Sequence, residues 1–193
     1  NDLYWPGSGN PDLRPASSTT NEVLLRKSAE NSLIEISIYD TEIEDLIAWN
    51  PNEFGQWQPA NINQADMQGI DINYSGSYQN FDYQIAFTFV ETEDKSTGKA
   101  LLRRPKFNTD FVLNYHWQEW SFGTIVSYRD EAKDSGNVDL DEYWLVDLTT
   151  SYQVNDALKV AGKVSNAFNK SYQSALNYQA DDTNYSVNVT YAF

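Results

Sequence analysis

The sequence predicts an all-β protein, an antiparallel β-barrel that spans a membrane, and three observations support that prediction. Polar and apolar side chains alternate with a period of two in about nine segments. The connections between these segments are short and long in turn, and aromatic residues gather at the segment ends. A period of two is the repeat of a strand, because successive side chains of a strand point to opposite faces.

The last segment, residues 184–193, shows the alternation most clearly. One face carries the large side chains Tyr185, Val187, Val189, Tyr191 and Phe193. The other face carries the small, mostly polar side chains that stand between them. We therefore expect a strand with one apolar face and one wet face, which is the pattern of a barrel strand between lipid and a hydrated lumen.

Eight earlier segments repeat this pattern and complete the set of predicted strands. In chain order they are residues 21–27, 33–40, 70–78, 81–89, 107–117, 120–128, 144–152 and 158–164, of which the first is the weakest. The apolar faces of the other seven carry Ile34, Ile36 and Ile38; Ile70, Ile72, Tyr74 and Tyr78; Phe81, Tyr83, Ile85, Phe87 and Phe89; Phe107, Phe111, Leu113, Tyr115 and Trp117; Phe122, Val126 and Tyr128; Trp144, Val146, Leu148 and Tyr152; and Leu158, Val160 and Val164. No window of comparable length has the three-and-four spacing of an amphipathic helix.

The connections separate a membrane barrel from a soluble β-sandwich, whose strands would also alternate. The short links are residues 28–32, 79–80, 118–119 and 154–157, and the long, polar and charged ones are residues 45–68, 91–106, 129–143 and 169–183. Outer-membrane barrels have short periplasmic turns and long extracellular loops, whereas sandwiches have loops at both ends. The alternation favours the barrel, with residues 1–20 as an extracellular loop and residues 21–193 as the nine strands and their connections.

Aromatic residues at the segment ends predict two belts at the membrane surfaces. Trp117 and Trp120 flank a short link, and Tyr128 and Trp144 lie toward the long links. In such barrels, amphipathic rings at both interfaces flank an apolar band. The alternative is ordinary pairing of aromatic side chains between neighbouring strands.

The composition fits an exported envelope protein and excludes several classes of function. The 193 residues carry a net charge of −15 without a basic stripe, which argues against binding to nucleic acid. The absence of cysteine excludes a disulfide framework and thiolate metal sites. No run of about 18 apolar residues exists that would predict a transmembrane helix. No signal peptide is recognised at Asn1, so we expect an exported protein with this start to lack part of its chain.

Motifs along the whole chain resemble those of TonB-dependent outer-membrane receptors and occur in that family's order. The most specific is residues 164–172, which are similar to the late signature VxNLFDKxY. Residues 10–15, together with Ser18 and Glu22, are similar to the motif NPxLxPExSxxxE, and residues 39–47 resemble the strand-to-loop element that follows it. Residues 68–71 are similar to xKGxE, and residues 103–106 are similar to RRPxH. Residues 101–104 and 177–179 resemble the receptors for cobalamin within the family. Ala16, Lys106 and residues 181–183 depart from these patterns, which leaves the ligand open.

The resemblance implies a 22-stranded barrel around a plug domain, of which this chain supplies about nine C-terminal strands and no plug. It implies a location in the bacterial outer membrane and active import of cobalamin or a related corrinoid into the periplasm. The implied partners are the remainder of the receptor, which can be a separate chain, TonB–ExbB–ExbD acting through the plug, the barrel-assembly machinery and outer-membrane lipid. Nine strands alone would leave two unpaired edges in lipid, so further strands are needed.

Two alternatives share these motifs. One is a portion of a siderophore receptor, and the other is a barrel-assembly substrate or fragment without uptake activity. Tyr191 and the terminal Phe193 resemble the signal read by the assembly machinery, and they would be the functional element in the second case. A partner chain that carries a plug would favour a receptor, whether for a corrinoid or a siderophore. The assembly complex as partner would favour the assembly substrate or fragment.

The residues expected to contact ligand lie in or near the long loops. By the family analogy, Arg103 reaches the ligand vestibule, where its forked donors suit the amides or phosphate of a corrinoid. The alternative is a rim charge that pairs with an acidic loop. Trp57, Tyr178 and Tyr185 are expected to grip a flat, partly apolar ligand, and the alternative for them is loop packing or an upper aromatic belt.

The sequence predicts no catalytic residue, metal site or cofactor. His116 is the only histidine, so we expect neither a His-based triad nor a site with several histidine ligands, but a solvated side chain in the lumen. Acidic residues in and around residues 129–143 are expected to form a solvated loop rather than a calcium site, because no Gly stands at the expected sharp turn. They are Asp130, Glu131, Asp134, Asp139, Asp141 and Glu142.

Overall fold

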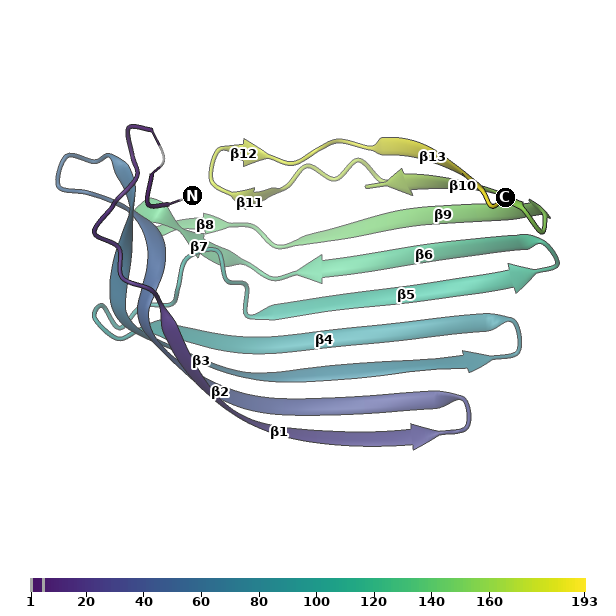
Figure 1. Cartoon of the computed structure of the whole chain (residues 1–193), viewed down its shortest axis with the longest axis horizontal. Coiled ribbons are helices and arrows are strands. Elements are labelled where there is room, and N and C mark those ends of the chain that lie inside the picture. Colours follow the sequence, from purple (N-terminus) through teal and green to yellow (C-terminus); the bar gives the residue numbers. More distant parts are fainter. Residues whose placement is uncertain (1, 5) are drawn as a thin grey trace.

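The computed structural model describes residues 2–4 and 6–193, most of which form one antiparallel sheet (Figure 1). The sheet has nine strands in the order β1-β2-β3-β4-β5-β6-β9-β10-β13. Their bounds are β1 Ser17–Ala29, β2 Ser32–Pro51, β3 Trp57–Tyr78, β4 Phe81–Asp94, β5 Phe107–Trp117, β6 Trp120–Arg129, β9 Tyr143–Asn155, β10 Leu158–Ser165 and β13 Asn184–Tyr191. All nine segments that the alternation predicts are therefore strands, and each pairs with its neighbour in the predicted order.

The long and short connections lie at opposite ends of the sheet. In Figure 1 the short turns are at the right and the long connections at the left. Gln79 and Gln118, each the first residue of a two-residue turn, have φ of 54° and 52° and so turn the chain in the left-handed region. This arrangement confirms the alternation of connections that distinguishes a barrel wall from a sandwich.

The structure corrects the expected extent of the first strands. Strand β1 begins at Ser17, so the loop expected for residues 1–20 ends earlier, and its Asn1 and Trp5 lie outside the described residues. Residues 45–68, expected as a long loop, are mostly the two arms of a projecting β2–β3 hairpin whose strands pair as far as Pro51 and Trp57. The sequence pattern misses these arms because polar residues stand on both of their faces, while the backbone ladder continues without an alternating pattern.

Two of the other predicted loops contain small hairpins. Within residues 129–143, β7 (Ala132–Asp134) and β8 (Val138–Leu140) are joined by the short 3₁₀ turn η1 (Ser135–Asn137). Within residues 169–183, β11 (Gln173–Ala175) pairs with β12 (Tyr178–Gln179). Strand β11 also contacts β8, so these two hairpins lie together at the long-loop end of the sheet (Figure 1).

The register gives the sheet one apolar face and one polar face. One apolar row crosses five neighbouring strands and contains Tyr74, Ile85, Phe111, Val126 and Val146. The polar side chains of the same strands point to the other face, since side chains alternate along a strand. Few apolar side chains are buried in the described part of the chain, namely those of Pro59, Ala65, Val90, Leu101 and Leu140. A sandwich would bury a second layer against the apolar face, so the single sheet excludes that rival prediction.

The sheet is open and ends at β1 and β13. Every residue of these two strands is exposed, and each presents one row of unpaired backbone groups. Both strands run from the long-loop end to the short-turn end, because nine antiparallel strands begin and end in the same direction. Among the described residues, no helix has the length and apolar character that a membrane span requires.

Candidate lumen wall and ligand-loop site

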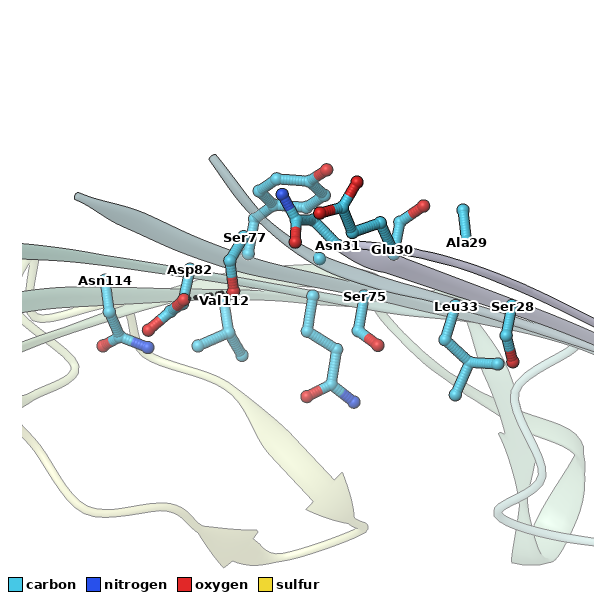
Figure 2. A pocket seen from close by; sticks show the side chains of 14 residues that line it. Ser28, Ala29, Glu30, Asn31, Leu33, Ser75, Ser77, Asp82, Val112 and Asn114 are labelled. Atoms are coloured by element: carbon cyan, nitrogen blue, oxygen red, sulfur yellow. Dashed lines mark hydrogen bonds between the residues drawn. The ribbon is translucent and has the colours of Figure 1, made fainter. Parts of the chain in front are cut away.

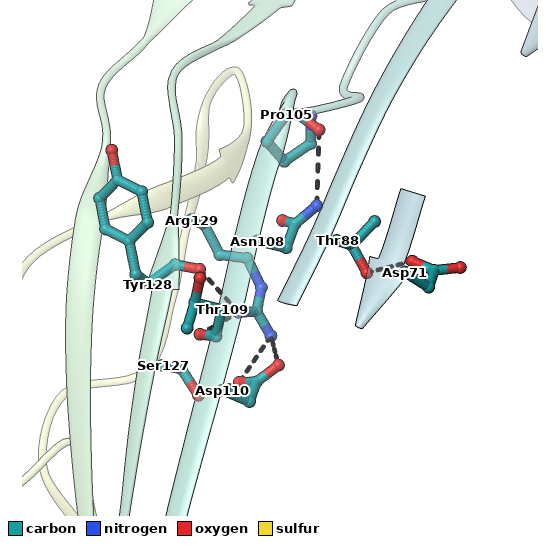
Figure 3. A network of polar contacts seen from close by, with 9 residues as sticks. All are labelled: Asp71, Thr88, Pro105, Asn108, Thr109, Asp110, Ser127, Tyr128 and Arg129. Atoms are coloured by element: carbon teal, nitrogen blue, oxygen red, sulfur yellow. Dashed lines mark hydrogen bonds and ion pairs between the residues drawn. The ribbon is translucent and has the colours of Figure 1, made fainter. Parts of the chain in front are cut away.

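The polar face of the sheet carries carboxylates that are satisfied by side chains of neighbouring strands. Asp110 on β5 accepts two hydrogen bonds of 3.0 Å from Nη2 of Arg129, one to each carboxylate oxygen, and one of 2.5 Å from Oγ of Ser127 (Figure 3). Arg129 also donates to the backbone oxygens of Thr109 and Tyr128. A guanidinium fixed by four acceptors is held firmly, so this network fixes the polar face where β5 and β6 approach the long loops.

Two more carboxylates of this face have a partner on the adjacent strand. Thr88 donates to Asp71 across 2.6 Å, as Figure 3 also shows. Lys163 on β10 lies 2.7 Å from Asp147 on β9. Paired charges and hydroxyls on one face, opposite an apolar face, form the lining of a hydrated lumen. Such a lining can contact a polar plug or water.

The short-turn end of the polar face contains a hydrogen-bonded row around His116. Nε2 of His116 lies 2.8 Å from Asp82, and its Nδ1 lies 3.0 Å from Oγ of Ser121, while 48% of the His116 side chain stays exposed. The row was missed because its members stand on three strands, β4, β5 and β6. The carboxylate of a catalytic triad is buried, whereas the side chain of Asp82 is 52% exposed and also accepts from Ser77. The row is therefore a polar lining and not a nucleophile site.

A hollow of about 570 Å³ lies beside this row, near the β1–β2 turn. In Figure 2 the side chains of Leu33, Ser75 and Asn114 point to the same side of the sheet into it, and Asp82 is hydrogen-bonded to Ser77 at its edge. Both polar and apolar side chains line this hollow, and it is open to solvent. It therefore suits contact with another polar surface more than the enclosure of a small ligand.

The long loops are organised by a residue that the sequence argument treated as solvated. The side chain of Asp134 is 0% exposed and accepts a 3.0 Å hydrogen bond from Nε of Arg103. It also accepts from the backbone amides of Ser135 and Leu176, each across 2.6 Å. The rest of the acidic loop stays near the surface, where Lys133 pairs with Asp139. No sequence signal distinguishes Asp134 from its acidic neighbours, because its partners come from distant loops.

The structure places the four predicted ligand residues at different points of the long-loop end. Arg103 lies between β4 and β5, Trp57 begins β3, and Tyr178 lies on β12. Tyr185 lies on β13 opposite Val164, on the same face as Val187, so its position favours an upper aromatic belt. Arg103 forms the ion pair with an acidic loop that was its alternative role, while 43% of its side chain stays exposed. Among the described residues no hydrogen bond or ring contact joins these four side chains.

The four predicted belt residues lie in two groups at opposite ends of the strands. Trp117 and Trp120 are opposite each other beside a short turn, and the ring of Trp120 lies 4.7 Å from that of Tyr152. At the long-loop end the rings of Tyr128 and Trp144 are 4.6 Å apart. All four side chains point to the apolar face, as an interface role requires, and they also form cross-strand pairs.

The proposed assembly signal lies at the short-turn end of the edge strand β13. Tyr191 is opposite Leu158, and Phe193 follows two residues after it, beyond the end of the strand. Their rings are 6.3 Å apart, and both side chains are exposed. This placement leaves both rings accessible to another protein or to lipid.

Comparison with known protein families matches residues 1–167 to the family described as TonB dependent receptor-like, beta-barrel. The chain is 35% identical over 199 residues to the vitamin B12 transporter BtuB of Vibrio vulnificus (strain YJ016), covering 100% of this chain and 32% of that protein. It is 34% identical over 201 residues to the vitamin B12 transporter BtuB of Photobacterium profundum, with 100% and 33% covered. The chain thus spans about a third of the length of these relatives.

Solved structures show the same fold. The copper transporter OprC superposes with a TM-score of 0.81 at 19% identity, over 97% of this chain and 33% of that one. The ferripyoverdine receptor of the outer membrane of Pseudomonas aeruginosa superposes with a TM-score of 0.72 at 17% identity, over 93% and 27%. These proteins are receptors and transporters, and the family is one of outer-membrane barrels. The chain belongs to the TonB-dependent receptor family, as a nine-stranded part of its outer-membrane β-barrel.

Proposed function

We propose that this chain forms wall and extracellular loops of an outer-membrane receptor that imports cobalamin or a related corrinoid. The observation that carries the proposal is the 35% identity of the whole chain to a vitamin B12 transporter. The fold supports it, because all the strands of the open sheet match a barrel wall and the long connections gather at one end. Import of a scarce ligand against a gradient would draw energy from TonB–ExbB–ExbD through a plug.

The edges of the sheet define the partner that this proposal requires. In lipid each unpaired backbone group is costly, so β1 and β13 need neighbouring strands. Both edges run in the same direction, and an antiparallel neighbour must run the other way at each of them. The completing part therefore contains an odd number of strands, and about thirteen would give the 22 strands of a plugged transporter. A second copy in the same membrane orientation would offer only parallel pairing, which disfavours closure by copies.

The ligand loops are the proposed site of capture. Trp57 and Tyr178 lie at the end of the sheet where the long connections gather, and their rings suit a large, partly apolar ligand, while Arg103 lies among the same loops. The polar lining, with Asp110, Asp147 and Lys163, is proposed to contact the plug.

The proposal is tested by the binding of cyanocobalamin to outer membranes that contain the assembled receptor, meaning the complete barrel that includes this chain. We expect saturable binding that a ferric siderophore does not displace, and uptake that stops when TonB is deleted. Binding of ferric siderophores alone would overturn the corrinoid assignment and support the siderophore alternative. Recovery of the chain only with the assembly machinery, without binding of either ligand, would support the assembly alternative.

A further inference from the structure

Asp134 is a buried carboxylate whose three hydrogen-bond donors join separate parts of the long-loop end. Arg103 comes from the β4–β5 connection, and Leu176 from the β11–β12 hairpin. Ser135 begins the turn that follows β7 in the same hairpin as Asp134. The side chain is 0% exposed, so its charge is balanced by these donors and not by solvent. One carboxylate thus connects three loops that are distant in the sequence.

The backbone reinforces the same junction. The amide of Arg103 donates to the carbonyl oxygen of Lys133 across 2.7 Å, so Arg103 is attached to this hairpin by its main chain as well as by its side chain. Arg103 has a φ of 59°, a conformation that a non-glycine residue keeps where its surroundings hold it. A second contact joins the ends of two of these loops, since the rings of Tyr143, at the start of β9, and Tyr172, just before β11, lie 4.3 Å apart.

The charges and hydrogen bonds around Asp134 keep its carboxylate ionised. Burial alone would raise the pKa of Asp134, but the hydrogen bonds from Arg103 and from the amides of Leu176 and Ser135 outweigh burial and lower the pKa. An ionised acceptor makes stronger hydrogen bonds than a neutral one, so the junction is strong while the carboxylate keeps its charge.

The junction also borders a hollow between the β4–β5 connection, the β7–β8 hairpin and the tip of the β2–β3 hairpin. This hollow of about 460 Å³ is lined by Leu102, Lys133 and Asp134, and by Pro51 near the hairpin tip. Two of its walls, the β4–β5 connection and the β7–β8 hairpin, are joined by the Asp134–Arg103 ion pair and by the backbone hydrogen bond from Arg103 to Lys133.

We propose that Asp134 is a positioning residue that holds the three loops as one unit for ligand capture, and that Arg103 acts through Asp134 rather than by touching the ligand. This inference rests on the proposed function for its ligand, but the junction itself is independent of the ligand's identity. It gives Arg103 a different role from the one expected by family analogy.

The first test is hydrogen exchange in the assembled receptor, which needs no ligand. We expect Asp134→Asn to speed exchange at the amide of Leu176 by about tenfold or more, because the charge is lost and the single neutral oxygen of Asn cannot replace both carboxylate oxygens, of which Oδ2 accepts from Leu176 and Arg103 and Oδ1 from Ser135. Amides of β5 and β6 should keep their protection, which separates loop release from a damaged barrel. Asp139→Asn is the matched control, since it removes an exposed carboxylate of the same hairpin. Unchanged exchange at Leu176 in Asp134→Asn would overturn the junction.

The second test is a double-mutant cycle on the binding of cyanocobalamin. We expect Asp134→Asn and Arg103→Gln to raise the Kd by similar factors, and the double variant to be no weaker than either single variant, because both remove one junction. A large loss for Arg103→Gln with wild-type affinity for Asp134→Asn would show that Arg103 touches the ligand and would overturn the proposal. If the unmutated receptor binds no corrinoid, the proposed function fails, while the exchange experiment still decides the junction.

Discussion

At the scale of single residues, the polar face of the sheet is held by local pairs whose strength differs with the donors available. Asp110 accepts hydrogen bonds from the guanidinium of Arg129 and the hydroxyl of Ser127, whereas Asp71 accepts only from the hydroxyl of Thr88 in the described structure. Removal of a charge therefore has different consequences at these two positions, although both are aspartates on the same face of the sheet, on β3 and β5. The difference comes from the partner and can be measured.

Asp110→Asn is expected to destabilise the assembled barrel by about 1 kcal/mol, because the charge-assisted bonds from Arg129 are lost at a partly exposed site. Asp71→Asn should change the free energy of unfolding by less than about 0.5 kcal/mol, since an Asn oxygen still accepts from Thr88. Urea unfolding of both variants in lipid bilayers measures the difference. Equal losses of stability in the two variants would show that the hydrogen bonds from Arg129 to Asp110 contribute little.

The pH dependence of the loops follows from Asp134. Its pKa is lowered below the ordinary value of 3.8, so the stabilisation by the charged carboxylate is fully present above that value and is lost as the pH falls through the folded-state pKa. Protection at the amide of Leu176, corrected for intrinsic exchange, is therefore expected to be constant between about pH 5 and 8 and to fall only below about pH 4. Loss of protection near neutral pH would show that another group controls the junction.

At the scale of the strands, the sequence predicts the wall well and the loops poorly. The alternation around Ile72, Ile85 and Phe111 identifies the strands and their apolar face, because one-sided exposure to lipid imposes a period of two. The arms of the β2–β3 hairpin lie beyond this constraint, so polar residues occupy both of their faces and the pattern disappears. Asp134 was not predictable for a related reason, since its donors Arg103 and Leu176 come from loops whose proximity depends on the whole fold.

A charged side chain on the apolar face of β13 is expected to destabilise the barrel. Val187→Arg should destabilise the assembled barrel by about 2–4 kcal/mol if this position lies near the bilayer centre. Asn188→Arg, one residue further and on the polar face, is the matched control and should be tolerated. Unfolding in bilayers compares the two variants, and similar stabilities would contradict the assignment of the faces.

Close packing of strands β2 and β3 depends on a glycine. Gly69 stands opposite Tyr39, and a Cβ at this position would lie 2.4 Å from the Tyr39 ring and 2.8 Å from the backbone oxygen of Phe89. Gly69→Ala is therefore expected to destabilise the barrel by about 1–3 kcal/mol. At Gly162 the nearest atom would be at 3.7 Å, so Gly162→Ala should have little effect. Thermal unfolding of both variants tests this difference, which would vanish if the ring of Tyr39 moved aside freely.

At the scale of the whole molecule, the open sheet is the feature that relates fold to function. A lumen wall with one polar face, one apolar face and two unpaired edges is incomplete as a barrier in lipid, and only further strands complete it. Residues 1–167 and the relatives place the chain in the TonB-dependent receptor family. The proposed corrinoid contacts of Trp57 and Tyr178 and the proposed positioning role of Arg103 lie in the long loops, whose geometry an alternating pattern does not encode.

Native mass spectrometry of the complex extracted gently from outer membranes, with cyanocobalamin added, tests most directly whether this chain is part of a corrinoid receptor. We expect an assembly in which this chain is joined to a plug and an odd number of further strands, about thirteen, and which binds one corrinoid. A stable assembly made only of copies of this chain, or a complete barrel that binds no corrinoid, would contradict this expectation.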